Sequence, residues 1–168
     1  GGAQDNAGEL NGDMTVDFGF IPNGSIGSTV FYDVNNNGSQ EPGNPLEHGV
    51  VGVTVTLLAD LDGDTMIDDV VGTDVTDSNG DYYFPNLPPG SYQVQIVTPP
   101  GDAPVSSTAN NPDNGVDGDD NGAQPGGSGT SITSPVIVLT EGGEPTVEGY
   151  SGGSQDDGAD TNGDMTVD

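Results

Sequence analysis

Short runs of alternating apolar residues constrain the fold of this chain most strongly. Residues 51–57 read VGVTVTL, so an apolar side chain returns at every second position. A period of two places these side chains on one face of a β-strand. Further strands are expected at residues 14–20, 26–33, 70–76, 82–84, 92–97, 132–140 and 165–168. No run has a helical period, and Gly, Pro and Asp separate the runs, so the pattern predicts an all-β protein, a β-sandwich of seven or eight short strands.

The charge of the chain is one-sided. It has 28 Asp and Glu residues and no Lys or Arg, which gives a formal net charge of −28. Nothing in it could neutralise phosphates, so nucleic acid is excluded as a partner, and an anionic membrane surface is disfavoured for the same reason. The absence of Cys excludes disulfides, and no apolar run is long enough to span a membrane.

The acidic residues are mostly Asp and lie beside Gly and Asn. Halophilic adaptation would spread acids over the surface, often as Glu, whereas Asp in such loops indicates turns or ligands for hard cations. Residues 60–69 hold five carboxylates. At ~6 Å separation and an effective dielectric constant near ~20, each like-charged pair costs roughly 2–3 kcal/mol. This segment therefore needs a cation or full exposure to solvent.

The two ends of the sequence repeat each other. Residues 1–17 align without gaps with residues 152–168, and 11 of the 17 positions are identical, including NGDMTVD. The offset of 151 residues indicates one repeat period plus a 17-residue overlap. Residues 1–20 are then expected to be the final strand of a preceding repeat, or a donor strand to a neighbour. Residues 24–168 are expected to form one repeat with an incomplete last strand. We expect residues 14–20 to pack into a neighbouring copy.

Several stretches resemble a known family. TDSNGDYYFPNLPPGSYQVQI (76–96) is similar to the signature hairpin of Cna B-type domains, and STVFYDVNNNGSQEPG (28–43) resembles the opening of the SdrD B-like branch. VDGDDNG (116–122), EPT (144–146) and TVDFGF (15–20) resemble late segments of that branch. The resemblance implies a Greek-key, immunoglobulin-like (prealbumin-like) sandwich with calcium in its loops, acting as a stalk or spacer in adhesins. Without Lys, the isopeptide cross-link of many Cna B-type domains is impossible here.

Residues 33–41 have the spacing of an EF-hand-like calcium loop. Oxygen-bearing side chains occupy its positions 1, 3, 5, 7 and 9, and Gly38 occupies position 6, where the loop bends sharply. Position 12 is Asn44 instead of a bidentate Glu, so Glu47 is expected to serve through a longer loop. The alternative is an Asx-rich turn without an ion. The candidate ligands of this group are Asp33, Asn35, Asn37, Ser39, Glu41 and Glu47.

Three further acidic groups are candidate calcium sites. The alternatives are a solvated hairpin tip for the first and a mobile linker for the second, whereas an ion at the third could be shared between repeats. They are Asp60, Asp62, Asp64, Asp68 and Asp69; Asp113, Asp117, Asp119 and Asp120; and Asp160, Asn162 and Asp164. Residues 77–81 (DSNGD) are expected to form only a hairpin turn. His48 has no second His or Cys for a transition metal and is expected to be exposed.

No catalytic constellation is recognisable, so the chain is not expected to be an enzyme. Tyr82, Tyr83 and Tyr92 could form a sugar-stacking face, although core and sheet-surface positions are favoured. The predicted function is a calcium-stiffened structural repeat of a secreted prokaryotic adhesin stalk, matrix fibre or filament, whose partners are neighbouring copies joined by tandem linkage or strand exchange. The alternatives are a ligand- or glycan-binding adhesin module and an accessory module of a secreted enzyme.

Overall fold

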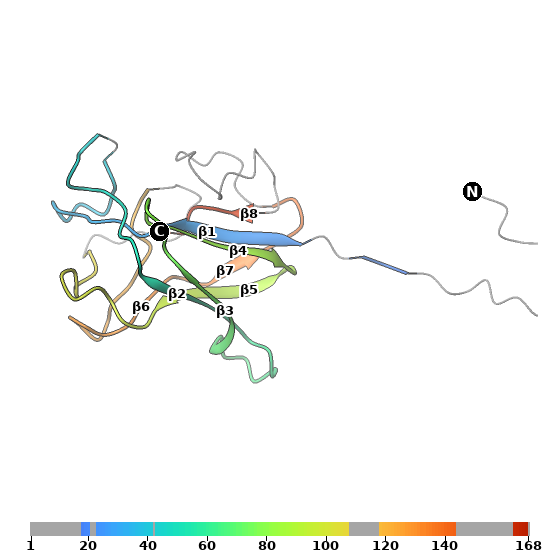
Figure 1. Ribbon diagram of the computed structural model, residues 1–168. Helices are drawn as coiled ribbons and strands as arrows, with labels where there is room; N and C mark the ends of the chain where they lie inside the picture. Colours follow the sequence, from blue (N-terminus) through green and yellow to red (C-terminus); the bar gives the residue numbers. More distant parts are fainter. Residues whose placement is uncertain (1–17, 21–22, 42, 108–117, 144–162, 168) are drawn as a thin grey trace, which may run out of the picture.

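Two β-sheets face each other in the computed structural model, which describes residues 18–20, 23–41, 43–107, 118–143 and 163–167 (Figure 1). These residues contain eight strands and no helix. The strands are β1 (Gly24–Thr29), β2 (Thr54–Ala59), β3 (Asp69–Val75), β4 (Asp81–Leu87), β5 (Gly90–Ile96), β6 (Ile132–Thr133), β7 (Ile137–Leu139) and β8 (Gly163–Asp164). The predicted all-β, immunoglobulin-like sandwich is confirmed.

One sheet has the order β4-β1-β8, and the other has the order β3-β2-β5-β6, with β7 also paired to β5. Most neighbours are antiparallel, but β8 runs parallel to β1, with Ser25 opposite Gly163 and Ile26 opposite Asp164. The last described segment of the chain therefore lies beside the first strand of the sandwich.

The core lies between the sheets and is built by the alternating runs. Val55 and Leu57 of β2 are fully buried, together with Ile26 of β1 and Ile137 of β7. The predicted run at 51–57 begins too early, because Val51 is 67% exposed in a turn. Gly52 adopts φ +82° in that turn, a conformation that favours glycine, and regular pairing starts only at Thr54.

The predicted strand at 132–140 is divided into β6 and β7 on either side of Pro135. Proline has no N–H to donate to a ladder, so continuous pairing stops there. Ser134 holds the break in place, because its hydroxyl accepts the Val94 N–H at 2.9 Å and donates to the Pro135 carbonyl at 2.8 Å. The segment stays in the sheet through two short pairings with β5.

Of the two copies of the repeated sequence, only the second includes described residues. Residues 163–167 are all buried, with Thr166 and Val167 at 0% and 1% exposure. Phe18 and Phe20 come after the first copy and are 82% and 93% exposed, and residues 18–20 form no strand. Residues 14–17 of the strand predicted there lie outside the described residues. Tyr82 and Tyr92 are buried, which confirms their predicted core positions.

Loops collect at one end of the sandwich. The segments after β1, after β5 and before β6 gather at the left of Figure 1, whereas the loop between β2 and β3 projects at the lower right. The candidate metal ligands are therefore divided between two separate places. No helix among the described residues is long and apolar enough to cross a membrane.

Candidate metal centres

The loop at residues 33–41, here called the first loop, is organised around one carboxylate. Asp33 accepts the Gly38 N–H at 2.8 Å and the Asn37 N–H at 3.2 Å. Gly38 adopts φ +77° and Asn36 φ +58°, the left-handed conformations that close such a loop and that Gly and Asn tolerate best. The spacing of the sequence thus produces a tight loop with its acidic and amide side chains close together.

Two asparagine amides satisfy the Glu41 carboxylate in the first loop. Asn35 Nδ2 donates to both Glu41 oxygens at 3.1 Å, and Asn37 Nδ2 also donates to Glu41. A calcium ion needs oxygen atoms instead, and each of these side chains carries an amide oxygen that a half-turn of the amide would present. Flipped in this way, the two amides would offer oxygens to an ion, although among the described residues only the acidic side chains of Asp60, Asp62 and Asp64 already bring three ligand atoms within 4.8 Å of one another.

A second segment of the chain closes over the first loop. Residues 118–120 pair with it through Gln40 N–H to the Gly118 carbonyl at 2.8 Å and Asp120 N–H to the Gly38 carbonyl at 3.0 Å. The Ser107 hydroxyl donates to Asp33 at 2.8 Å. These contacts bring Asp119 and Asp120, predicted as a separate group, against the first loop. Five acidic residues from the segment after β1 and the segment before β6 thus lie in this region. We call Asp33, Glu41, Glu47, Asp119 and Asp120 the two-loop cluster, which does not include the loop between β2 and β3.

The two-loop cluster contains carboxylate oxygens that are buried without a partner. Glu47 is 3% exposed; its Oε2 accepts the Glu41 N–H at 2.9 Å, but its Oε1 has no hydrogen bond. Asp120 is 9% exposed; one of its oxygens accepts the Gly122 N–H at 2.9 Å, and its Oδ2 has no hydrogen bond. A buried, unpaired carboxylate is strongly unfavourable, and the chain has no Lys or Arg to compensate it.

The pKa values of the acidic side chains in the cluster reflect their burial and the neighbouring negative charges. Burial, and then the negative charges of Asp33 and Asp119, raise the pKa of Asp120 to about 6. The pKa of Glu47 is raised, first by its interaction with the neighbouring Glu41 carboxyl group, whose own pKa is lowered. For Asp33, burial acts to raise the pKa, but its N–H and hydroxyl donors outweigh that effect and lower it. Within the cluster, Asp120 and Glu47 thus bind a proton more readily than usual, whereas Asp33 and Glu41 favour the charged form.

The loop between β2 and β3, here called the second loop (residues 60–69), has the same local construction. Asp60 accepts the Gly63 N–H at 2.7 Å and the Thr65 N–H at 3.0 Å, and Asp64 accepts the Met66 N–H at 2.8 Å. Ligand atoms of Asp60, Asp62 and Asp64 all lie within 4.8 Å of one another, so these three residues could hold a metal ion.

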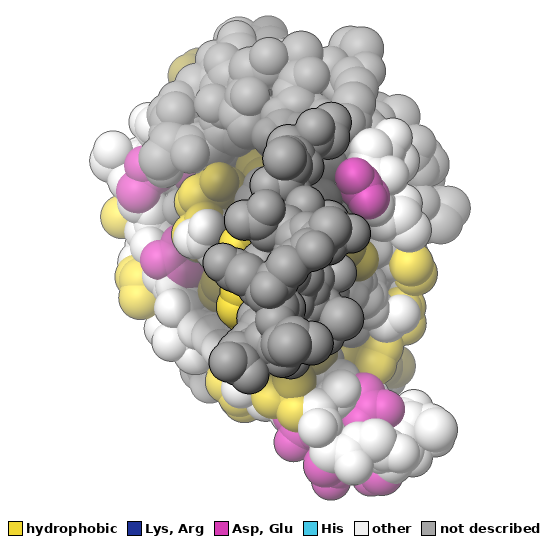
Figure 2. Space-filling model, turned by 90° about the vertical axis from the view of Figure 1, so that its right-hand side faces the viewer, with side chains coloured by type: hydrophobic (Ala, Val, Ile, Leu, Met, Phe, Trp, Pro, Cys, Tyr) yellow, Lys and Arg dark blue, Asp and Glu magenta, His cyan; other side chains and the backbone are white. Residues whose placement is uncertain are grey.

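All three of these aspartates are exposed, and Figure 2 shows acidic side chains gathered on the loop that projects below the sheets. Asp69 accepts the Leu61 N–H at 2.9 Å and ties the two ends of the loop together. Partial desolvation, and then the neighbouring carboxylates, raise the pKa of Asp68. The predicted residues of the second loop thus lie near one another, at the surface.

Other predicted ligands have different positions. Asp164 is 4% exposed, and its Oδ1 accepts the Thr166 N–H at 3.1 Å and the Thr166 hydroxyl at 2.7 Å. Asp113, Asp117, Asp160 and Asn162 lie outside the described residues. His48 is exposed, as predicted, and lies against the Tyr32 ring.

Residues 77–81 form a turn in which Asp77 accepts the Asn79 N–H at 2.7 Å. The buried Asp81 at the start of β4 was not expected from the sequence. Its Oδ1 accepts the Thr29 hydroxyl at 2.9 Å, and its Oδ2 has no hydrogen bond. Ser107, which contacts Asp33, was also not predicted, since a single Ser in a polar stretch carries no recognisable signal.

Two facing β-sheets with carboxylate-rich loops define an immunoglobulin-like β-sandwich domain with candidate cation sites in its loops. The model of the SdrD B-like domain family matches residues 24–141, and the chain belongs to this family. The match begins at β1 and covers both the first and the second loop. It confirms the resemblance found in the sequence.

Similar proteins are large. The chain is 37% identical over 122 residues to serine-aspartate repeat-containing protein F of Staphylococcus epidermidis, covering 71% of this chain and 6% of that protein. It is 41% identical over 98 residues to serine-aspartate repeat-containing protein D of Staphylococcus aureus (strain Newman), covering 58% of this chain and 7% of that protein. The chain thus spans a small fraction of the length of these relatives.

A solved structure from Pseudomonas aeruginosa, of a protein proposed to bind carbohydrate, matches with a TM-score of 0.34 and 14% identity. The match covers 71% of this chain and 82% of that one. Similarity at this level carries no conclusion about function.

Proposed function

We propose that this domain is a non-enzymatic, extracellular structural repeat in which Ca²⁺ braces the two-loop cluster. The observation that carries the proposal is the pair of buried carboxylate oxygens without partners, Glu47 Oε1 and Asp120 Oδ2, in a chain without Lys or Arg. A hard dication accepts several carboxylate, amide and carbonyl oxygens at once, which no side chain of this protein can do.

The ion would act as a mechanical brace. Asp33, Glu41 and Glu47 belong to the segment after β1, whereas Asp119 and Asp120 belong to the segment before β6. An ion held by both segments links two parts of the chain that otherwise meet through a few hydrogen bonds. The second loop would hold a further ion through Asp60, Asp62 and Asp64, stiffening only the β2–β3 hairpin.

Stiffened domains of this kind suit a string of copies. The repeated residues at both ends of the sequence and the membership in a family found in serine-aspartate repeat-containing proteins support a role as a spacer in a surface stalk, fibre or filament. We propose neighbouring copies of the same repeat as the partners of this domain.

Calorimetry with and without chelator tests the proposal. Ligand at a hundredfold excess over its Kd stabilises a protein by about 2.7 kcal/mol, and each kcal/mol moves the melting temperature by roughly 2–4 °C at this size. We therefore expect EDTA to lower the melting temperature by about 5–10 °C or more, and Ca²⁺ to restore it better than Mg²⁺, which requires a stricter octahedron.

The Asp60→Asn variant is the matched control, because it alters the exposed loop and leaves the two-loop cluster intact. It should retain most of the EDTA effect, whereas Asp120→Asn should lose most of it. An identical melting curve in EDTA and in Ca²⁺ for the unmodified chain would refute the calcium brace.

A further inference from the structure

One side of the β3-β2-β5-β6 sheet faces away from the core, and we call it the outer face. Val55 and Leu57 of β2 point into the core. Because successive side chains of a strand alternate between its two faces, Thr54, Thr56 and Leu58 point outward. Residues that lie opposite one another in neighbouring strands share a face. The outward residues opposite those of β2 are Val70, Thr73 and Val75 of β3 and Gln93 and Gln95 of β5. None of these eight side chains carries a charge.

Aspartates do occur in this sheet, but they lie on its other side. Asp74 of β3 is opposite the core residue Val55, and its carboxylate accepts the Tyr83 N–H of β4 at 2.8 Å. Asp69 is opposite Ala59, which also belongs to the core. The low strand propensity of Asp therefore does not keep it out of β3. The outer face is neutral in a chain of which 17% of the residues are charged, all of them acidic.

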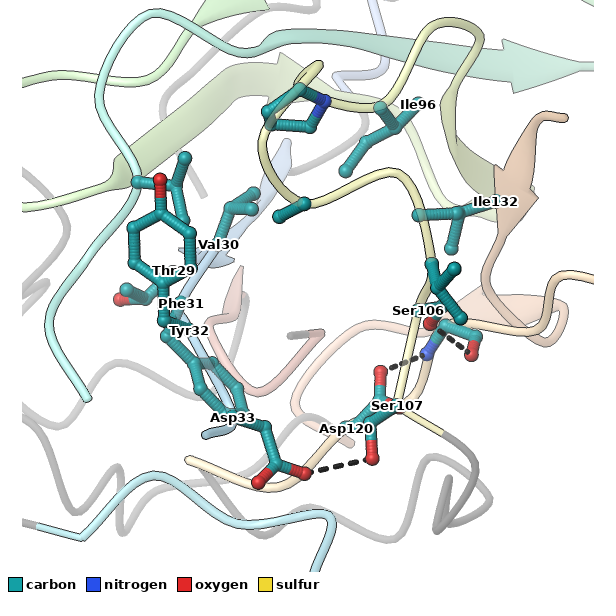
Figure 3. A pocket seen from close by; sticks show the side chains of 15 residues that line it. Thr29, Val30, Phe31, Tyr32, Asp33, Ile96, Ser106, Ser107, Asp120 and Ile132 are labelled. Atoms are coloured by element: carbon teal, nitrogen blue, oxygen red, sulfur yellow. Dashed lines mark hydrogen bonds between the residues drawn. The ribbon is translucent and has the colours of Figure 1, made fainter. Parts of the chain in front are cut away.

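The cavity beside the two-loop cluster differs from the outer face in this respect. It has a volume of about 160 Å³ and apolar walls that include Ile96 and Ile132 (Figure 3). Asp33 and Asp120 stand at its edge, where the Ser107 hydroxyl donates to Asp33 at 2.8 Å. A second copy of this acidic chain would be repelled at the cavity, whereas the outer face presents no like charge to it.

The outer face also exposes apolar side chains. Val70, Val75 and Val97 are 60%, 56% and 57% exposed. Val97 follows Gln95 by two positions and lines a shallow hollow together with Thr54 and Thr56, so it belongs to the same face. In Figure 1 this face is the underside of the lower layer, which contains β2, β3, β5 and β6. Valine and threonine are β-branched and pack well against a pleated surface, so the outer face suits contact with a second sheet.

The neutrality of the outer face selects among partners. A cationic partner would be attracted to the acidic loops and would gain nothing from this surface. A second copy of this chain carries the same net charge of −28, so two copies can make close contact only where neither surface bears carboxylates. The outer face meets this condition, and two sheets pack face to face at about 10 Å when their side chains interdigitate.

We propose that the outer faces of two copies of this domain pack against each other, sheet on sheet, with their strands antiparallel. The second loop, with its five carboxylates, lies at one end of the face, and the antiparallel arrangement places the two second loops at opposite ends of the contact. The contact is lateral, in addition to the end-to-end linkage proposed above. It rests on the proposed function only in that the domain occurs in many copies, and it requires no ion.

The size of the outer face predicts a weak contact between single domains. Four strands at ~4.8 Å spacing, with six residues of ~3.3 Å each, give roughly 400 Å² per copy and about 800 Å² per pair. Stable complexes bury about 1,200 Å² or more, so we expect a Kd near ~1 mM for one pair. In a string of copies each contact raises the effective concentration of the next one, so strings should associate more tightly than single domains.

Sedimentation equilibrium of this chain tests the contact. The weight-average mass should rise from 16.9 kDa at low concentration to about 25 kDa at ~1 mM, where half of the copies would be paired. Raising NaCl from ~0.15 M to ~0.5 M should strengthen the association at least about threefold, because salt screens the repulsion between the copies. A mass that stays at the monomer value in both salt concentrations would overturn the proposal.

A pair of charge variants tests whether the outer face makes the contact. Val97→Asp places a carboxylate on this face and leaves the pairing of β5 intact, because β5 ends at Ile96. Leu46→Asp is the matched control, since it adds the same charge at a side chain that is 64% exposed in the segment after β1. Val97→Asp should weaken the association at least about tenfold, and Leu46→Asp should change it by less than about twofold. Equal effects of the two variants would contradict the proposal.

A nitroxide on the outer face locates the contact directly, since the chain has no Cys of its own. Attached to Gln95→Cys and mixed with ¹⁵N-labelled copies, it should broaden the amide signals of Thr56 and Thr73 of those copies. The same label on Leu46→Cys should leave these signals sharp. Broadening on another surface would overturn the proposal. So would shifts of the outer-face signals with added dextran, a neutral polysaccharide, but not with protein concentration, because the face would then bind a glycan.

Melting curves of the same samples in Ca²⁺ and in EDTA separate this inference from the proposed function. Absence of association together with a large EDTA effect would remove the lateral contact and leave the calcium brace. Association through the outer face together with an unchanged melting curve would remove the brace and leave the lateral contact.

Discussion

The first and second loops share a local design but differ in their surroundings. In both, an aspartate at position 1 accepts the N–H of position 6, at 2.8 Å for Asp33 and 3.0 Å for Asp60, and position 6 has a positive φ. The second loop stands in solvent, whereas residues 107 and 118–120 cover the first loop. Of the two regions, only the one around the first loop has buried carboxylate oxygens without hydrogen bonds, Glu47 Oε1 and Asp120 Oδ2, and only there do we expect stability to depend on a cation.

The largest expected effect contrasts the two loops at position 1. In saturating Ca²⁺, Asp33→Ala should lower the free energy of unfolding by on the order of 3 kcal/mol, because partly buried donors lose their acceptor and the ion loses a ligand. Asp60→Ala should cost under about 1 kcal/mol, because an exposed hairpin tip can open locally. Urea titrations of both variants measure the difference, and equal losses would contradict the distinction between the loops.

The similarity of the two loops could be predicted from the sequence, because it depends on the spacing of residues within each loop. The alternation of apolar residues likewise predicted β2, β5 and the sandwich itself. The prediction failed where the local backbone decides the outcome, as in the turn at Val51.

The composition of the two-loop cluster was only partly predictable. Asp119 and Asp120 were expected to form a separate group with Asp113 and Asp117. Their pairing with the first loop depends on contacts between distant segments. Ser107 and the buried Asp81 were missed for the same reason. Spacing identifies the residues that form a loop, but burial depends on what the rest of the fold places over it.

The next effect, of at most the same size, should result from the raised pKa of Asp120 and reverses its sign between EDTA and Ca²⁺. Its folded pKa of about 6 lies above the ordinary value near ~4, so the ion-free folded state binds more protons than the unfolded state between these pH values. In EDTA this group should therefore lower the free energy of unfolding, by up to about 3 kcal/mol, as pH rises from ~4 to ~6. Saturating Ca²⁺, which needs the carboxylate, should oppose this fall.

The Asp120→Asn variant isolates this contribution. At pH 7 it should stabilise the protein in EDTA, because a buried charge is removed, and destabilise it in Ca²⁺, because a ligand is removed. Urea titrations between pH 4 and pH 8 measure both effects, and Asp68→Asn in the second loop is the exposed control with a small expected change. Destabilisation by Asp120→Asn in both conditions would show that the side chain acts only through packing.

The smallest expected effect comes from backbone strain at position 6, which differs between the two loops. Thr65 adopts φ +75° at position 6 of the second loop, where the first loop has Gly38. A β-branched residue in this conformation is strained by about 1 kcal/mol or more. Glycine removes this strain but gains freedom in the unfolded chain, which offsets part of the benefit. Thr65→Gly should therefore raise the free energy of unfolding by roughly 0.5–1 kcal/mol.

Asn36→Gly is the matched control for this substitution, since Asn36 has φ +58° but asparagine tolerates that region. It should change stability by a few tenths of a kcal/mol at most. The strain at Thr65 is local. If an ion at the second loop contributes little to folding, Thr65→Gly should raise the free energy of unfolding equally in Ca²⁺ and in EDTA. A gain confined to EDTA would mean that the ion already compensates the strain, and the second loop would then resemble the first in coupling metal binding to stability.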